Sequence, residues 1–223
     1  MFPAFIFDLD GTLIDTAPDL RTSLNTILSR RGRSPVDIAQ LRHLVGRGAR
    51  NLLAEAFRRS GAPASPAELE ALYHEFIEEY GRHVADESLP YPGVVETLQQ
   101  LKTDGARMAV LTNKPHGLTQ SLIGKLGLAG YFGAVIGGGF RPYLKPDPRL
   151  FEETLAGIGG RGPGAVVVGD SITDVETARG GQAPVILVSY GYTPEPAATL
   201  GADLVLDDFR DVPAAGRQLL GIG

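Results

Sequence analysis

Two aspartates separated by one residue are the first feature of this sequence that could do chemistry. Asp8 and Asp10 follow a short apolar run that begins at Ala4, and Gly11 and Thr12 come directly after them. One carboxylate of such a pair can attack phosphorus, while the other acts as a general acid and later activates water. Gly11 would let the backbone approach a phosphate closely and offer its N–H there. The spacing therefore favours phosphoryl-group chemistry.

More polar residues follow other apolar runs further along the chain, at Thr112, Asn113, Lys145, Asp170 and Asp174. Thr112 and Asn113 can donate hydrogen bonds to phosphoryl oxygens, and Lys145 supplies a fixed positive charge for the transferring group. The aspartates bring the number of carboxylates to four. At ~4 Å and an effective dielectric constant of ~20, each like-charged pair costs about 4 kcal/mol. Such a cluster needs a cation. An oxygen-only ligand set suits Mg²⁺ and disfavours zinc and copper.

The elements that must position these residues are strands alternating with helices. Apolar runs predict strands at Ala4–Asp8, Arg107–Thr112, Ala165–Gly169 and Val185–Ser189, with weaker candidates at Ala134–Gly137 and Asp203–Leu206. Helical patterns separate these runs, which favours an α/β fold with a Rossmann-like parallel sheet. Ligands bind at the carboxyl ends of parallel strands. All of the polar residues named above are therefore expected along one edge of the sheet.

The stretch from Thr16 to Tyr80 is different, because it shows one amphipathic helix pattern after another and no convincing strand. The Pro-Gly pair at Pro92 and Gly93 marks the return to the sheet. We therefore predict an α/β catalytic core over residues 1–14 and 92–223, and an inserted helical cap domain over residues 15–91. These two segments are called the core and the cap below.

The bulk composition excludes several classes of protein. The chain of 223 residues has no cysteine, which rules out disulfides, thiolate catalysis and cysteine-based metal sites. Its net charge of −5 argues against a nucleic-acid surface. No apolar run approaches the ~18 residues that a membrane span needs, and the N-terminus has no basic region typical of a signal peptide. We expect a cytoplasmic protein, monomeric or homodimeric, whose partner is a small phosphorylated metabolite.

Four segments in order carry a resemblance to a known family. They are FIFDLDGTLIDT from Phe5 to Thr16, LTN from Leu111 to Asn113, the pair Lys145-Pro146, and GDSITD from Gly169 to Asp174. They resemble the motifs of haloacid dehalogenase superfamily phosphatases. The resemblance covers nearly the whole chain, and LVGRGAR at 44–50 and VSYGYTPEP at 188–196 look like bacterial phosphoglycolate phosphatases. One position departs from that branch, because Phe140 stands where we expect an acidic residue.

The resemblance implies a role for each matching residue. Asp8 corresponds to the nucleophile and Asp10 to the acid/base. Asp8, the backbone carbonyl of Asp10, and Asp170 correspond to the ligands of Mg²⁺. Asp174 corresponds to a carboxylate that orients a metal-bound water or Lys145. The implied reaction is Mg²⁺-dependent hydrolysis of a small phosphomonoester through an aspartyl-phosphate, with 2-phosphoglycolate as the best single substrate.

Arg47 is a further candidate, because it lies in the cap between Gly46 and Gly48. Two glycines suggest a loop that approaches something closely. The cap contains no lysine, so an anionic group on the leaving portion of the substrate would have to meet an arginine there. Arg47 is therefore predicted to bind the carboxylate of phosphoglycolate once the cap closes.

Several activities share this fold. A 2-haloacid dehalogenase of the family lacks the second aspartate, so Asp10 and Asp170 argue against it. A phosphonate hydrolase needs a cap lysine, which residues 16–91 do not supply. A β-phosphoglucomutase-like mutase and a pyrophosphatase both remain compatible with all four motifs. A non-catalytic sensor of phosphorylated ligands is the alternative from another class, although no catalytic position is missing.

Overall fold

The computed structural model describes residues 3–160 and 164–222, so residues 1–2, 161–163 and 223 of the predicted core lie outside the described residues. A six-stranded parallel sheet forms the centre, with the strand order β5-β4-β1-β6-β7-β8. The strands are β1 (Ala4–Phe7), β4 (Arg107–Pro115), β5 (Ala134–Gly138), β6 (Ala165–Gly169), β7 (Val185–Val188) and β8 (Leu204–Leu206). The predicted Rossmann-like α/β fold and all six predicted strands are confirmed.

Helices cover both faces of the sheet, and the alternation of side chains along β1 shows how. Phe5 and Phe7 point to the face that packs against α5 (Val94–Thr103), α6 (His116–Lys125) and α9 (Val212–Leu219). Ala4 and Ile6 point to the opposite face, under α7 (Pro148–Gly157) and α8 (Ile172–Gly180). Because both faces are buried, the strand is apolar at every position rather than at every second one.

A two-stranded antiparallel ribbon joins the core to the cap, and the sequence patterns did not predict it. It consists of β2 (Ile14–Asp15) and β3 (Leu89–Pro90), at the points where the chain leaves the sheet and returns to it. Each strand has only two residues, which is too short to show a period. The return segment is also fixed by the buried Asp19 carboxylate, which accepts hydrogen bonds from the backbone N–H groups of Glu87 and Ser88.

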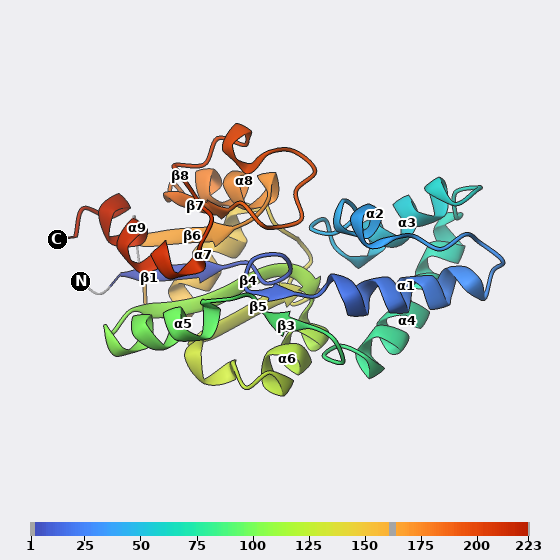
Figure 1. Cartoon of the computed structure of the whole chain (residues 1–223), viewed down its shortest axis with the longest axis horizontal. Helices are drawn as coiled ribbons and strands as arrows, with labels where there is room; N and C mark the ends of the chain where they lie inside the picture. Colours follow the sequence, from blue (N-terminus) through green and yellow to red (C-terminus); the bar gives the residue numbers. More distant parts are fainter. Residues whose placement is uncertain (1–2, 161–163, 223) are drawn as a thin grey trace.

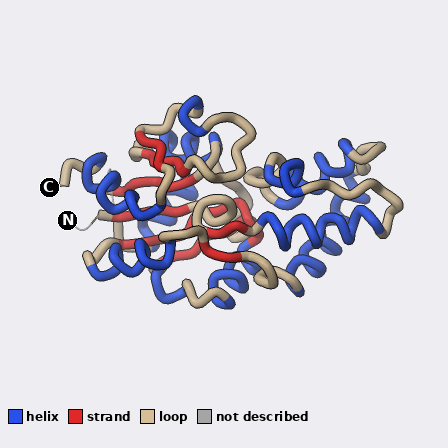
Figure 2. The backbone as a smooth tube through the Cα atoms, in the orientation of Figure 1, coloured by secondary structure: helices blue, strands red, loops and turns tan. Residues whose placement is uncertain are grey.

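The cap consists of helices gathered at one end of the molecule, beyond the end of the sheet and away from both termini (Figures 1 and 2). They are α1 (Ala17–Ser29), α2 (Ile38–Arg42), α3 (Ala49–Arg59) and α4 (Pro66–Arg82). α4 starts at a capping box, in which the Ser65 hydroxyl accepts from the N–H of Glu68 and the Glu68 carboxylate accepts from the N–H of Ser65. No helix in the described ranges is long and apolar enough to cross a membrane.

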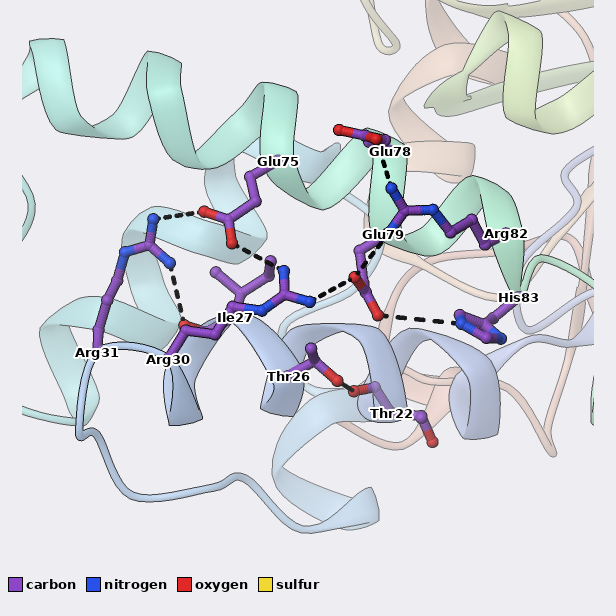
Figure 3. A network of polar contacts seen from close by, with 10 residues as sticks. All are labelled: Thr22, Thr26, Ile27, Arg30, Arg31, Glu75, Glu78, Glu79, Arg82 and His83. Carbon is purple, nitrogen blue, oxygen red and sulfur yellow. Dashed lines mark hydrogen bonds and ion pairs between the residues drawn. The ribbon is translucent and has the colours of Figure 1, made fainter.

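A network of ion pairs on the outside of the cap connects α1 with α4 (Figure 3). Arg30 at the end of α1 bonds the carboxylates of Glu75 and Glu79, each at 2.9 Å. Arg31 also binds Glu75, and Arg82 lies 3.3 Å from Glu79. Exposed ion pairs each contribute little, but a network shares its geometry among several partners. We call these five residues the cap network.

Candidate active site

The carboxyl ends of the core strands face the cap, and they bring the predicted polar residues together (Figure 1). Asp8 follows the last residue of β1, Thr112 and Asn113 lie in the second half of β4, and Asp170 follows β6. Lys145 arrives from the loop before α7. Its ammonium lies 3.1 Å from Asp8 Oδ1 and 2.7 Å from Asp174 Oδ1. Residues distant in the sequence therefore form one buried charged cluster.

Asp8 has the least satisfied carboxylate of this cluster. Its Oδ1 atom is buried and makes no hydrogen bond, and Lys145 is close enough for an ion pair without the angle of a hydrogen bond. Burial raises the pKa of Asp8 to about 6, since the nearby Asp174 carboxylate partly cancels the effect of the Lys145 charge. A buried oxygen with an open lone pair is suited to nucleophilic attack or to metal binding.

A metal ion would fit beside this oxygen. Asp8, Asp170 and Asp174 each offer a carboxylate oxygen, and these oxygens all lie within 4.8 Å of one another. Burial, together with the charges of the other two aspartates, raises the pKa of Asp170 well above its usual value. The carboxylates therefore resist ionising side by side without a cation. An all-oxygen donor set with one unbonded oxygen suits Mg²⁺.

Asp174 is already committed to other partners. Its Oδ2 atom accepts hydrogen bonds from the backbone N–H groups of Asp170 and Ser171, and from the Ser171 hydroxyl at 2.7 Å. Its Oδ1 atom accepts from the Lys145 ammonium. Burial opposes the charge of Lys145, but the carboxylates of Asp174 and Asp8 outweigh burial and raise the pKa of Lys145. This arrangement matches a carboxylate that orients Lys145 better than one that binds a metal directly.

Asp10 points into a separate set of contacts. Its Oδ1 atom accepts from the Thr16 hydroxyl at 2.7 Å and from the Lys114 ammonium at 3.0 Å. Both contacts fall on Oδ1, which leaves Oδ2 for the acid/base role that the sequence predicts for Asp10.

Gly11 makes a close approach that a larger residue would prevent. It has a φ of +82°, and a Cβ atom there would lie 2.4 Å from Asp170 Oδ2. Its N–H, which we expected to be offered to a phosphate, donates instead to the Ile14 carbonyl at 3.0 Å. This turn occupies the donor, so in the structure Gly11 contributes space rather than a hydrogen bond.

Thr112 and Asn113 lie in β4 next to Asp8 but are used differently. The Thr112 hydroxyl accepts from the N–H of Lys114 at 3.3 Å, which leaves its own hydrogen for another acceptor. The Asn113 amide nitrogen donates to the carbonyls of Gly46 and Lys145, and its Oδ1 accepts from the N–H of Lys145. Asn113 therefore fixes Lys145 and holds a cap loop against the core, and its side chain is not free for phosphate here.

A cavity lies between the cap and the core. It is partly open to solvent, and Asp8, Asp10, Thr112 and Asn113 line its core side. Gly46 and Gly48 from the cap loop line it as well, whereas Arg47 between them is exposed and does not belong to the lining. The structure thus brings the loop of Arg47 to the site but not its side chain, and the role predicted for Arg47 stays a prediction.

Sequence reasoning missed Lys114, Tyr80 and Tyr192. The Lys114 ammonium is buried between Asp10 and the hydroxyl of Tyr80, at 3.0 and 2.6 Å. Burial lowers the pKa of Lys114, and the Asp10 carboxylate opposes this effect. The signal was present, because Lys114 follows Thr112 and Asn113 directly in the sequence. Tyr80 gave no such signal, because it belongs to an apolar stripe of a predicted cap helix.

Tyr192 connects the site to the start of the cap. Its N–H donates to Asp170 Oδ2 at 2.6 Å, and its hydroxyl accepts from the N–H groups of Thr16 and Ala17 at 2.7 and 2.9 Å. The same hydroxyl donates to Asp15 at 2.6 Å. The backbone of Tyr192 thus holds an expected metal ligand, and its side chain holds the first turn of α1. Phe140 is removed from these groups, since its ring packs on His116 at a centroid distance of 4.8 Å.

Comparisons with known proteins agree with this geometry. A family model for haloacid dehalogenase-like hydrolases matches residues 2–181. A phosphoglycolate phosphatase of Caulobacter vibrioides is 48% identical over 214 residues, covering 96% of this chain and 90% of that protein. One of Agrobacterium fabrum is 42% identical over 222 residues, covering 99% and 95%.

Solved structures resemble this one over nearly their whole length. The crystal structure of a predicted phosphoglycolate phosphatase from Haemophilus somnus has a TM-score of 0.89 at 30% identity, covering 96% of this chain and 97% of that chain. The structure of CbbY from Rhodobacter sphaeroides, in complex with phosphate, has a TM-score of 0.83 at 26% identity, covering 98% and 100%.

Proposed function

We propose that this chain, which belongs to the haloacid dehalogenase-like hydrolase family, hydrolyses a small phosphomonoester through a phosphorylated aspartate, with 2-phosphoglycolate as its best single substrate. Family membership and relatives named phosphoglycolate phosphatase at 42–48% identity make it a phosphatase. The observation that carries the proposed mechanism is the buried Asp8 Oδ1 atom. It has no hydrogen bond, and Asp8 faces a cavity that the cap closes.

In the proposed reaction Asp8 and Asp10 divide the work. The Asp8 carboxylate attacks phosphorus, and the bond between phosphorus and the leaving oxygen breaks while Asp10 gives that oxygen its proton. Asp10 then takes a proton from water, which attacks the aspartyl-phosphate. Inorganic phosphate leaves and the Asp8 carboxylate is restored. Lys145 and the Thr112 hydroxyl face the transferring group and stabilise its charge.

We further propose that the enzyme depends on Mg²⁺. Asp8, Asp170 and the backbone carbonyl of Asp10 would hold the ion, which when bound neutralises negative charge on the phosphoryl oxygens. The single positive charge of Lys145 cannot balance the negative charges of Asp8, Asp170 and Asp174. We also propose that residues 15–91 form a cap that shields this chemistry from water. The core is then formed by residues 1–14 and 92–223.

A turnover screen tests the proposed function. The purified protein is assayed with Mg²⁺ against phosphomonoesters of two to six carbons and against pyrophosphate. We expect the highest kcat/KM with 2-phosphoglycolate. Faster phosphate release from pyrophosphate, or activity that depends on an added sugar bisphosphate, would replace the proposal with a pyrophosphatase or a mutase. A null result over the whole panel would favour a sensor of phosphorylated ligands.

A further inference from the structure

The cavity between cap and core has an uneven lining, which bears on what it accepts. Its cap side is mainly apolar, with side chains of Leu20, Val45, Ala49, Leu52 and Phe76. Asp8 and Asp10 place negative charge on its core side. Among the described lining residues, Lys114 is the one with a cationic side chain. An anionic group on the leaving portion of a substrate would therefore meet one positive charge in this cavity.

Lys114 lies next to Asp10 in the lining of this cavity. Its ammonium lies 3.0 Å from Asp10 Oδ1, beside the residue expected to protonate the leaving oxygen. Its side chain is 1% exposed, so the charge acts with little screening by water. An ammonium has three hydrogens, and the contacts with Asp10 and Tyr80 use two of them. The third hydrogen of the Lys114 ammonium is left for a further acceptor.

Tyr80 brings a second donor to the same point from the cap. Its hydroxyl accepts from Lys114 at 2.6 Å, and this contact leaves the hydroxyl hydrogen for another partner. Burial raises the pKa of Tyr80 well above its usual value, so the hydroxyl keeps that hydrogen. The ring of Tyr80 also lies against the ammonium, 4.4 Å from Nζ to the ring centroid. Lys114 comes from β4 and Tyr80 from α4, so the pair forms only when the cap lies on the core.

We propose that Lys114 and Tyr80 together bind the carboxylate on the leaving portion of the substrate, and that this pair makes the enzyme prefer short anionic phosphomonoesters over neutral ones. The inference rests on the proposed phosphatase function and names the group that selects its substrate. The two free hydrogens can reach the two oxygens of one carboxylate. Charge-assisted hydrogen bonds of this kind are stronger than neutral ones, particularly in a buried site.

The other cations near the site are placed less well for this task. Lys145 is held by Asp8 and Asp174, on the side of the transferring group. Arg47 is exposed and lies outside the lining of the cavity. Arg47 is the sequence-based candidate because the cap contains no lysine. In the structure a lysine of the core, Lys114, lines the cavity that the cap covers.

The test compares two substrates of similar size in two variants. Wild type, Lys114→Met and Lys125→Met are assayed with 2-phosphoglycolate and with ethyl phosphate, which lacks the carboxylate. Methionine keeps much of the length and packing of lysine but removes the charge. Lys125 is exposed at the end of α6, so its replacement is the matched control. Loss of the Asp10 partner should slow both reactions, and the ratio of kcat/KM values is therefore the readout.

For Lys114→Met we expect the ratio of kcat/KM for phosphoglycolate to that for ethyl phosphate to fall by about 30-fold or more. Lys125→Met should leave the ratio unchanged. Equal losses on both substrates would overturn the proposal, because Lys114 would then serve Asp10 alone. Tyr80→Phe keeps the ring and its packing, so it decides the matter if Lys114→Met does not fold. We expect it to lower the ratio by about 5-fold or more, and an unchanged ratio would overturn the proposal.

The inference and the proposed function can fail separately. Suppose that the wild-type enzyme does not hydrolyse 2-phosphoglycolate but hydrolyses other phosphomonoesters. The proposed substrate would then be wrong, whereas the proposed carboxylate site would still stand. The comparison is then made with 3-phosphoglycerate and glycerol 3-phosphate, which differ by a carboxylate. Preference for the acid, lost in Lys114→Met, would support the inference. A wild-type enzyme with no such preference in either pair would contradict it.

Discussion

The charged cluster at the edge of the sheet and the cap network are built from the same kinds of residue but are balanced differently. The sheet edge holds more carboxylates than ammonium groups, in the set Asp8, Asp10, Asp170, Asp174, Lys114 and Lys145. The cap network sets three arginines against two glutamates, and Arg82 also binds Glu78, so that the opposite charges are equal in number and every member has a partner (Figure 3). The sheet edge keeps an unbonded oxygen at Asp8, whereas the cap network is complete. Buried charge without a full set of partners marks the candidate site, whereas the paired charges of the cap network serve the fold.

The largest expected effect comes from neutralising the nucleophile. Asp8→Asn is nearly isosteric, but its amide cannot attack phosphorus. Turnover of 2-phosphoglycolate should fall by more than about 1000-fold, while circular dichroism reports an intact fold. Residual activity above one part in about a thousand would argue against covalent catalysis at Asp8.

Removing the cation should stop the reaction as well. We expect EDTA to abolish phosphate release and Mg²⁺ to restore it. Ca²⁺ should restore it poorly, because its looser shell of about 6–8 ligands misplaces the groups that must lie in line. Full activity in Ca²⁺ would show that the cation merely neutralises charge.

Arg47→Ala sharpens the comparison with Lys114. If Arg47 turns into the cavity and pairs with a substrate carboxylate, kcat/KM on 2-phosphoglycolate falls by roughly 30- to 1000-fold. The loss on ethyl phosphate should be several-fold smaller. Arg47 is exposed in the structure, so Arg47 and Lys114 are alternative ligands for the substrate carboxylate. Assaying both variants side by side shows which residue binds it. No loss on either substrate would leave Arg47 an exposed side chain in a turn.

Stability should respond in opposite directions to matched changes in the two clusters. The pKa of Asp8 is raised from 3.8 to about 6 by burial, so the folded state favours the protonated form. Its contribution to stability is complete below pH 3.8 and is lost as the pH rises through about 6. In EDTA at pH 8, Asp8→Asn should therefore be more stable than wild type by roughly 1–3 kcal/mol. Urea unfolding at pH 4 and pH 8 measures the difference, which should shrink at pH 4. A variant that is less stable than wild type at pH 8 would contradict the cost of burying the charged Asp8 carboxylate.

The smallest effect is expected in the cap network. Glu75→Gln weakens the ion pairs with Arg30 and Arg31 and should cost about 0.5–1 kcal/mol of unfolding free energy. High salt should reduce the difference. The kcat on 2-phosphoglycolate should be unchanged. If activity fell by more than the loss of stability can explain, the cap network would have to set the position of the cap.

Much of this architecture could be predicted from the sequence because its signals are local. Each core strand is an apolar run of a few residues, and Asp8 and Asp170 each come directly after one of them. Contacts between side chains of the cap and the core were not predictable. Tyr80 and Lys114 meet only because the cap lies on the core, and Asn113 holds Gly46 for the same reason. The N–H of Gly11 was misjudged because a turn to Ile14 leaves no mark on the pattern of residue types.

The central claim is that Asp8 becomes phosphorylated, and direct trapping tests it most directly. The enzyme is mixed with saturating 2-phosphoglycolate and Mg²⁺, quenched rapidly in acid and reduced with borohydride, which converts an aspartyl-phosphate to homoserine. Peptide mass spectrometry then locates the modified residue. The account predicts homoserine at position 8 in wild type and none in Asp8→Asn. Homoserine at a different aspartate, or an unmodified Asp8 in enzyme quenched during steady turnover, would contradict it.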